Sequence, residues 1–205
     1  MLLLVGERAG VAAGRLGAAV TGYDVRSAVA EQVKSLGADF LELEAGKGAE
    51  GEGGYARELT DEEKAAQQQE LTDAITEFDV VITTALVPGR PAPKLVTADA
   101  VERMKPGAVV VDLAGEAGGN CELTEPGQTV VKEDVTIVGP INLPSTMPDH
   151  ASSLYARNVQ SLLELMVDEG ELRLDFEDEI IAGACITRDG EIVHEGAKQA
   201  AGAPA

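Results

Sequence analysis

The sequence predicts an α/β fold with a doubly wound parallel sheet, because short apolar runs alternate with segments that carry helix signals. The runs have the length and the Val, Leu and Ile content of strands. A smaller strand is expected at residues 129–131, within a loop. The main expected strands cover residues 2–5, 18–23, 40–43, 80–84, 109–113 and 135–138.

Each of the clearer helices has its own boundary signal. Ser27 can cap a helix that closes at Gly37, because serine oxygens accept from the first turn and glycine ends a helix readily. Thr60 and Glu63 have the spacing of a capping box, and Thr97 can cap a later helix. The expected helices cover residues 9–16, 27–35, 60–78, 97–104 and a stretch from Ser152 or Ser153 to 167.

The end of the chain predicts smaller elements. Short strands are expected at residues 172–176, 180–187 and 191–194, with a hairpin turn at Arg188-Asp189-Gly190. Residues from 197 onward have low complexity and are expected to be disordered. The domains expected are a Rossmann-like domain over 1–150, a C-terminal helix with short strands over 151–195, and a disordered tail over 196–205.

The chain of 205 residues is strongly acidic, with 36 Asp and Glu, 16 Lys and Arg, and a net charge of −20. Such a surface repels nucleic acid and anionic membranes at ordinary salt, so neither is expected as a direct partner. The carboxylates are spread along the chain. This favours a surface adapted to high salt, where screening reduces self-repulsion; an acidic patch for a basic partner is the alternative.

Other kinds of site have little support. Cys121 and Cys185 are far apart and lack the spacing of metal ligands, so a reducing, cytoplasmic setting is expected and no metal. His150 and His194 have no Ser, Cys or carboxylate spaced for a catalytic relay, so no catalytic residue is assigned. No apolar run approaches the ~20 residues of a membrane helix.

Asp24 is the most informative single residue. It ends the second expected strand, and ligands of parallel α/β sheets bind at the carboxyl ends of strands. There its carboxylate can accept hydrogen bonds from an adenosine ribose, and its charge opposes a 2′-phosphate, which favours NAD over NADP. Arg26 complicates this choice, because an arginine can accommodate a 2′-phosphate. An ordinary turn or cap residue is the alternative for Asp24.

Three loops add candidate contacts. In residues 112–120, paired glycines are expected to expose backbone amides, and Asn120 can both donate and accept hydrogen bonds. Residues 83–89 could let a flat ring or ribose approach the backbone, or could form a rigid turn. Tyr55 lies at the edge of a glycine-rich loop and could fold over a bound ligand.

The first expected loop departs from a dinucleotide fingerprint. Residues 6–14 do not match the glycine spacing G-x-G-x-x-G, and the distance from Gly6 to Asp24 is short. Glu7 is electrostatically unfavourable beside a pyrophosphate. The segment is therefore either a shortened phosphate loop or a plain turn into a helix.

In combination these segments resemble the NAD(H)-binding component, the alpha subunit, of proton-translocating NAD(P) transhydrogenase, with the alanine dehydrogenases as the sister family. The likeness covers about residues 15–195. The matching segments occur in one order, at residues 23–26, 32–38, 53–56, 83–93, 104–107, 112–121, 143–145 and 154–158.

The resemblance implies an activity and a set of cofactor contacts. NADH held by this chain would pass a hydride to NADP+ on a partner domain, without a general base, and a membrane-spanning partner would couple the transfer to proton movement. The chain would be a homodimer, cytoplasmic and peripheral to the membrane through its partner subunits. The residues implied to line the cofactor are Val11, Asp24, Val25, Arg26, Gly54, Tyr55, Gln67 and Leu86.

The chain departs from the family in three respects. The resemblance implies a preceding domain that completes the nicotinamide pocket with an Arg-Gln-Asp loop; residues 1–205 are expected not to include it, and residues 151–195 would pack on it. Its glycine loop is shortened, and Thr146 stands where many relatives carry Arg. An alanine-dehydrogenase-like fragment, and a degenerate nucleotide-fold protein that binds a partner without chemistry, therefore remain as alternatives.

The charge generates a prediction about salt. The melting temperature should rise between low and molar salt, because screening weakens repulsion among the excess carboxylates. Thermal unfolding followed by circular dichroism at both salt concentrations measures this. A melting temperature that stays flat would contradict adaptation to high salt.

Overall fold

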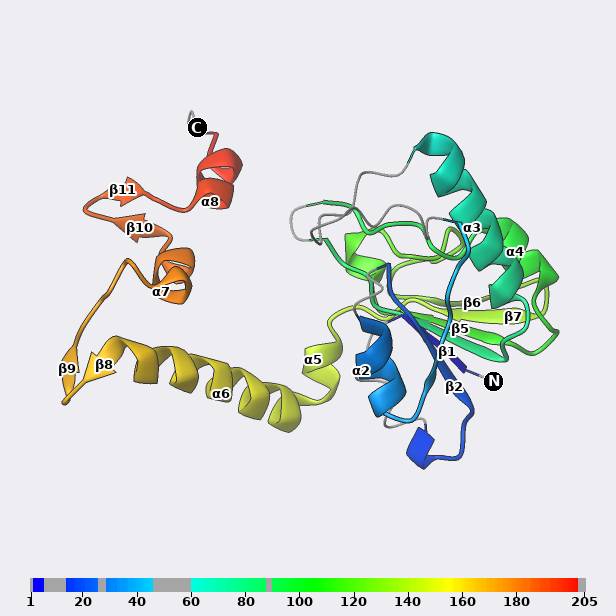
Figure 1. Ribbon diagram of the computed structural model, residues 1–205, viewed down its shortest axis with the longest axis horizontal. Coiled ribbons are helices and arrows are strands. Elements are labelled where there is room, and N and C mark those ends of the chain that lie inside the picture. The colour runs from blue at the N-terminus through cyan, green and yellow to red at the C-terminus, as the bar shows by residue number, and fades with distance from the viewer. Residues whose placement is uncertain (1, 6–13, 26–28, 46–59, 88–89, 203–205) are drawn as a thin grey trace. The chain divides into compact units, whose positions relative to one another are not determined.

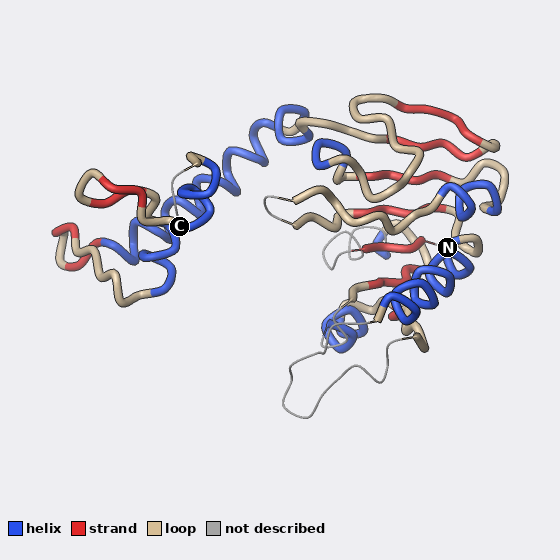
Figure 2. Tube along the Cα trace, turned by 90° about the horizontal axis from the view of Figure 1, so that it is seen from above, coloured by secondary structure: helices blue, strands red, loops and turns tan. Residues whose placement is uncertain are grey.

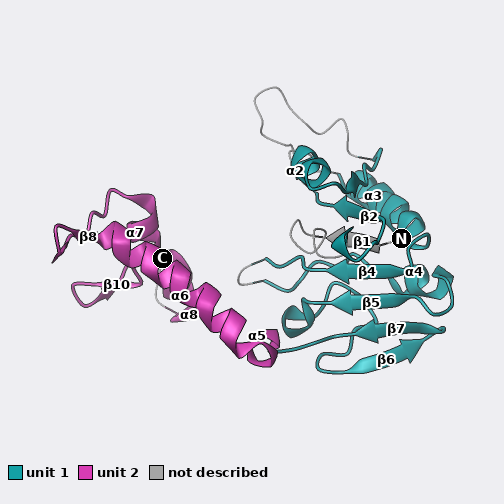
Figure 3. Ribbon diagram, turned by 90° about the horizontal axis from the view of Figure 1, so that it is seen from below, with its two compact units in different colours: residues 1–141 teal, residues 142–205 magenta. Residues whose placement is uncertain are grey.

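The computed structural model describes residues 2–5, 14–25, 29–45, 60–87 and 90–202. It divides into two compact units, Met1–Ile141 and Asn142–Ala205 (Figure 3). The boundary thus falls before the position expected from the sequence, residue 150. The second unit begins with α5 (Leu143–Thr146), ahead of the long helix α6 (Pro148–Met166).

The first unit is built on a seven-stranded sheet with the order β3-β2-β1-β4-β5-β7-β6 (Figure 2). All neighbours pair in parallel except β6 and β7, which form an antiparallel hairpin. This confirms the doubly wound parallel sheet. The strands are β1 (Leu2–Val5), β2 (Val20–Tyr23), β3 (Asp39–Phe40), β4 (Val80–Thr83), β5 (Val109–Asp112), β6 (Thr129–Lys132) and β7 (Val135–Val138).

The strand order defines where a ligand can bind. After β3 the chain crosses β1 and β2 and continues with β4 on the other side of β1. The carboxyl ends of β1 and β4 therefore flank the topological switch point, where the connections leave in opposite directions and open a crevice.

Two helices begin where their capping signals predicted. Thr60 caps α3 (Asp61–Ile75) with both bonds of the capping box, because its hydroxyl accepts from the Glu63 amide at 3.2 Å and its own amide donates to Glu63 Oε2 at 2.9 Å. Thr97 caps α4 (Ala98–Arg103). Of the two earlier expected helices, 27–35 appears as the shorter α2 (Ala30–Ser35), whose N-cap is Val29 and not the expected Ser27. Most of 9–16 lies outside the described residues.

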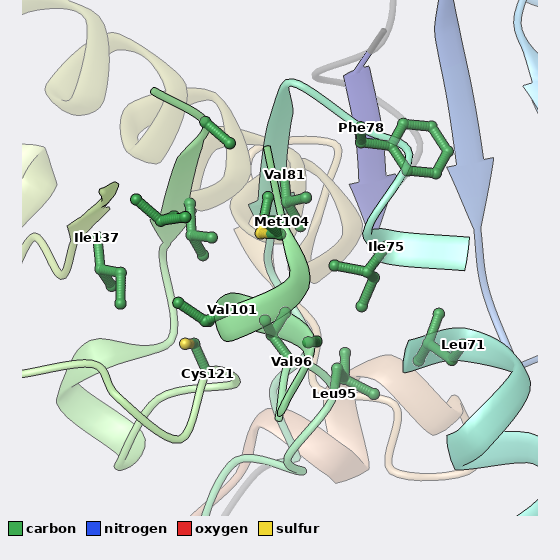
Figure 4. Packing of buried hydrophobic residues seen from close by; sticks show 14 of the residues in the cluster. Leu71, Ile75, Phe78, Val81, Leu95, Val96, Val101, Met104, Cys121 and Ile137 are labelled. Atoms are coloured by element: carbon green, nitrogen blue, oxygen red, sulfur yellow. The ribbon is translucent and has the colours of Figure 1, made fainter. Parts of the chain in front are cut away.

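One face of the sheet carries the main core. α3 and α4 lie side by side and bring Ile75 and Val101 against Val81 of β4 and Ile137 of β7 (Figures 1 and 4). These four side chains are at most 1% exposed. Val110 of β5 belongs to the same cluster. Alternate residues of adjacent strands thus face the same helices, as the pleat requires.

α2 packs on the opposite face of the sheet and depends on a glycine. A Cβ on Gly22 of β2 would lie 2.8 Å from Cγ1 of Val33, which is buried on α2. The absence of a side chain at Gly22 therefore lets the helix approach the strand. Helices on both faces complete the doubly wound architecture.

The second unit holds α5 (Leu143–Thr146), α6 (Pro148–Met166), α7 (Glu179–Ala184), α8 (Glu195–Ala200) and two small hairpins. The hairpins pair β8 (Val167–Asp168) with β9 (Glu171–Leu172) and β10 (Thr187–Arg188) with β11 (Glu191–Ile192). Asp189 and Gly190, both with positive φ, form the turn of the second hairpin, which confirms the turn expected there. Among the described helices, none combines the length and the hydropathy needed to cross a bilayer.

Three expectations for this unit were wrong. The strand expected at 180–187 is largely α7, because the Asp178 carboxylate accepts from the amides of Ile180 and Ile181 and so caps a helix. The tail expected to be disordered from residue 196 contains α8, which begins where His194 Nδ1 accepts from the Ala197 amide at 3.2 Å. The helix expected to start at Ser152 or Ser153 starts at Pro148.

We predict that Gly22→Ala destabilises the first unit by about 1–3 kcal/mol, because the new methyl group overlaps the stiff, β-branched Val33. Urea unfolding followed by circular dichroism measures the change. Gly183→Ala is the matched control, since its Cβ would meet nothing within 4 Å; an equal loss in both variants would contradict the packing argument.

Candidate nucleotide site

The candidate site is the carboxyl edge of the sheet around the switch point. Asp24 follows β2, the segment Thr84–Val87 follows β4, and Asp112 ends β5. Parallel strands bring these ends to one edge, so the candidate residues at 24, 83–87 and 112–120 share the same edge, while residues 88 and 89 lie outside the described residues.

Asp112 is the centre of the hydrogen bonding at this edge. Its side chain is fully buried, and each carboxylate oxygen accepts two hydrogen bonds. Oδ1 accepts from Thr83 Oγ1 and from the Ala114 amide, both at 3.1 Å. Oδ2 accepts from the Cys121 amide at 2.9 Å and from Thr124 Oγ1 at 2.7 Å. One carboxylate therefore joins the end of β4, the end of β5 and the loop that follows β5.

The hydrogen bonds decide the charge state of Asp112. Burial alone raises the pKa of this carboxyl, but the hydrogen bonds from Cys121, Thr124 and the neighbouring backbone amides outweigh burial and lower the pKa below its ordinary value of 3.8. Asp112 is consequently ionised at neutral pH.

The glycine-rich loop after β5 is closed on itself, contrary to the expectation of exposed amides. The Gly118 amide donates to Gly115 O at 3.1 Å, and the Gly119 amide donates to Ala114 O at 2.9 Å. Gly119 has a φ of +79°, and a Cβ there would lie 2.7 Å from Asp112 Oδ2. The glycines thus serve a tight turn around Asp112, and their amides are not available to a phosphate.

Asn120 clamps two segments with its side chain. Its Oδ1 accepts from the Ala85 amide at 3.0 Å, and its Nδ2 donates to Ala85 O at 2.9 Å and to Pro93 O at 2.8 Å. The residue is 0% exposed. Its role as a cofactor contact stays a prediction, since these three side-chain bonds go to the protein's own backbone.

Lys94, in the loop after β4, also binds the loop after β5. Its Nζ donates to Gly118 O at 2.7 Å and to Gly119 O at 2.9 Å. No local sequence pattern identifies Lys94 or Thr124, because their partners lie in other loops. The one available signal is their position beside the proline-rich segment and the glycine-rich segment.

The candidate contacts of the adenosine side lie at the end of β2. Asp24 is half-buried and Val25 is 72% exposed. Tyr23 belongs to the main core, and its pKa is raised, first by burial and then by the negative charge of Asp24.

The remaining candidate contacts are only partly described. Gln67 is half-buried on α3, and Leu86, after β4, is 57% exposed. Val11, Arg26, Gly54 and Tyr55 lie outside the described residues. The structure therefore brings Asp24 and Leu86 to the same edge of the sheet and does not test the contacts proposed for the loops at 6–13 and 46–59.

Metal and histidine chemistry have no support in the part of the chain that the structure describes. Those residues contain no group of His, Cys, Asp and Glu that could hold a metal ion. His194 caps α8 and His150 lies in the first turn of α6. Cys121, which is buried, and Cys185 are free thiols.

The comparison with protein families decides the relationship. The sequence model for the alanine dehydrogenase/PNT C-terminal domain matches residues 4–195. The chain belongs to this family. The fold, with its order β3-β2-β1-β4-β5 and its polar strand ends, agrees with this assignment.

Similar proteins include transhydrogenase subunits and, at lower identity, alanine dehydrogenases. An NAD(P) transhydrogenase subunit alpha of Rhodospirillum rubrum is 48% identical over 93% of this chain, which corresponds to 51% of that protein. The alanine dehydrogenase of Mycolicibacterium smegmatis is 29% identical over 88% of this chain and 48% of its own length. The chain thus spans about half the length of the curated relatives it matches.

Solved structures give the same order of similarity. A transhydrogenase from Sinorhizobium meliloti superposes with a TM-score of 0.75 at 41% identity and covers 94% of this chain and 52% of its own. An L-alanine dehydrogenase reaches 0.70 at 25% identity, over 97% of this chain and 52% of its own.

We predict that Asp112→Asn lowers the unfolding free energy of this alanine dehydrogenase/PNT domain by about 3 kcal/mol at pH 7. Each carboxylate oxygen serves two donors, so either orientation of the amide turns an NH₂ group toward two donors. Urea unfolding measures the loss. Asp134→Asn, at an exposed turn with positive φ, is the matched control and should change little.

The same pair of proteins tests the effect of pH. The folded pKa of Asp112 is lowered, so as the pH falls the unfolded chain takes up the proton first. The contribution of the ionised Asp112 to stability is complete above about pH 3.8, the ordinary pKa of an aspartate carboxyl. This contribution is lost as the pH falls through the lower pKa of Asp112 in the folded protein. The difference in stability between wild type and Asp112→Asn should therefore shrink in acid; a difference that is constant down to about pH 2.5 would contradict a charged Asp112.

Proposed function

We propose that this chain is the NAD(H)-binding module of a proton-translocating NAD(P) transhydrogenase, which presents NADH for hydride transfer to NADP+ on a partner domain. The observation that carries the proposal is Asp24 at the carboxyl end of β2, beside the switch point, in a chain 48% identical to a transhydrogenase alpha subunit. In the parallel sheet an acidic residue at this place faces the adenosine ribose.

The adenosine side of the proposed site explains a choice of NAD over NADP. Ribose hydroxyls donate to the Asp24 carboxylate, and a 2′-phosphate would bring a second negative charge against it. Val25 is exposed beside Asp24 and offers an apolar surface next to the ribose. Arg26 belongs to the same proposed contact.

The fit between these residues and a dinucleotide rests on the geometry of the edge. Asp24 and Leu86 follow strands on opposite sides of β1, and the Thr84–Val87 segment is fixed by backbone hydrogen bonds to Asn120. A dinucleotide placed across β1 would meet both. Gln67, Val11, Gly54 and Tyr55 complete the proposed contacts, and Asn120, predicted from the sequence as a contact, holds the segment after β4.

The residues of this chain would bind and orient the cofactor and exclude water from it. Bound NADH supplies the hydride. Hydride transfer requires no nucleophile or general base from the protein, because its main demand is that the two nicotinamide rings be held at reacting distance. At the described edge, the polar side chains of Asp112 and Asn120 bind the backbone of neighbouring loops. A rigid edge of this kind agrees with a role in orienting the cofactor.

The proposed partners follow from the relatives. An NADP-binding subunit would accept the hydride and a membrane-spanning subunit would couple the reaction to protons. The module itself would act as a homodimer on the cytoplasmic side. About half of the Rhodospirillum rubrum relative and of the Sinorhizobium meliloti structure lies beyond the matched region, so a further domain that completes the nicotinamide pocket is part of the proposal.

We predict that the protein binds NADH more tightly than NADPH and that Asp24→Asn weakens NADH binding by about 1–3 kcal/mol, because the carboxylate accepts from the ribose. Titration followed by nicotinamide fluorescence measures both constants. Asp39→Asn is the matched control, since Asp39 is exposed at the opposite, amino end of β3.

Three outcomes separate the candidate functions. An unchanged NADH dissociation constant in Asp24→Asn would remove Asp24 from the site. Binding of neither nucleotide would favour the degenerate nucleotide fold. Tight NADH binding without hydride exchange, after addition of an NADP-loaded transhydrogenase partner, would favour the alanine-dehydrogenase-like alternative, which the 25% identical L-alanine dehydrogenase structure supports.

A further inference from the structure

We infer that Asn120 is a positioning residue for the nicotinamide half of the dinucleotide: it fixes the backbone of Ala85 so that Leu86 leaves β4 toward the ligand, and it does not itself touch the ligand. This inference rests on the proposed function. It changes the role of Asn120 from a contact to a support.

The first argument is the geometry of the Asn120 side chain. It pairs with both the amide and the carbonyl of Ala85, at 3.0 and 2.9 Å, as a neighbouring strand would. The second hydrogen of Nδ2 goes to Pro93 O at 2.8 Å. Both donor positions of Nδ2 are thus used within the protein, and the side chain is fully buried.

The second argument is that Asn120 is itself held firmly. Its carbonyl accepts from the Leu95 amide at 2.8 Å and the Val96 amide at 3.1 Å. The next amide along the chain, that of Cys121, donates to Asp112. Because the backbone of Asn120 is held by these bonds, its side chain can hold the backbone of Ala85 in one position.

Independent bonds brace the same pair of loops. The Ala92 amide donates to Ala117 O at 2.8 Å, and Lys94 Nζ donates to the Gly118 and Gly119 carbonyls. The loops after β4 and β5 therefore form one braced unit. Within it, the apolar side chains of Leu86 and Val87 remain exposed, and Leu86 is the more exposed of the two at 57%.

The topology indicates which half of the ligand this unit faces. A doubly wound sheet consists of two mononucleotide-binding halves, one on each side of the switch point. Asp24 belongs to the half with β1, β2 and β3, and Asn120 and Leu86 belong to the half that begins with β4. Because Asp24 takes the adenosine ribose in the proposed function, the braced unit faces the nicotinamide half.

The test compares two ligands. ADP carries the adenosine and the pyrophosphate but lacks the nicotinamide half. We expect Asn120→Ala to weaken NADH binding roughly 5- to 50-fold and to leave ADP binding within about twofold, as measured by calorimetry. Asp24→Asn should weaken both ligands. Asn158→Ala, at an exposed position of α6, is the matched control and should change neither.

A double variant separates support from contact. If Asn120 acts through Leu86, then Leu86→Ala should weaken NADH binding in the wild type and cost much less in the Asn120→Ala background. If Asn120 touched the ligand directly, the two effects would multiply, and the inference would be overturned. Equal weakening of ADP and NADH by Asn120→Ala would also overturn it, because that pattern reports general damage.

The wild-type protein provides a measurement that does not depend on the folding of a variant. Hydrogen exchange of the Ala85 amide, which donates to Asn120, should slow when NADH is added and stay unchanged with ADP. Equal slowing by the two ligands would contradict the inference. Failure of wild-type protein to bind NADH at all would instead overturn the proposed function.

Discussion

A single buried carboxylate sets the order of the carboxyl edge. A charge inside a protein is stable only when its oxygens are occupied by donors, and Asp112 meets this condition with four of them. The donors come from β4, from the turn after β5 and from residues 121 and 124. Satisfying the charge therefore requires these segments to converge, so the electrostatic demand of one residue fixes the relative position of several loops.

At this edge of the sheet, backbone groups bind within the protein and several side chains remain near the surface. Around Asn120 and Lys94 the partners are backbone carbonyls and amides, which every residue type except proline supplies in full. Rigidity at this edge thus comes mainly from side chains that bond to the main chain of neighbouring loops. The side chains of Asp24, Val25 and Leu86 remain at the surface or close to it, where a ligand can reach them. A rigid backbone with outward side chains suits a module whose proposed task is orientation.

Local signals in the sequence predicted most of the first unit, because its elements carry their own boundaries. The capping box at Thr60 and the cap at Thr97 appear as expected, and the expected strands appear with shifts of a few residues. The second unit was harder, since Asp178 and His194 start helices in stretches whose composition suggested strand or disorder. The site was hardest. Asn120 was recognised as a polar loop residue, but its partners Ala85 and Pro93 lie 35 and 27 residues away, and no local pattern specifies such pairs.

Cys121 carries a practical consequence of this arrangement. Its thiol is fully buried in the main core (Figure 4), and burial raises its pKa, so the reactive thiolate is scarce while the fold is intact. Its own amide is one of the donors to Asp112. Alkylating reagents can modify this sulfur only in molecules in which the packing around residue 121 has opened. The rate at which Cys121 is alkylated therefore reports how often its surroundings open. The less deeply buried Cys185 serves as an internal reference for access of the reagent.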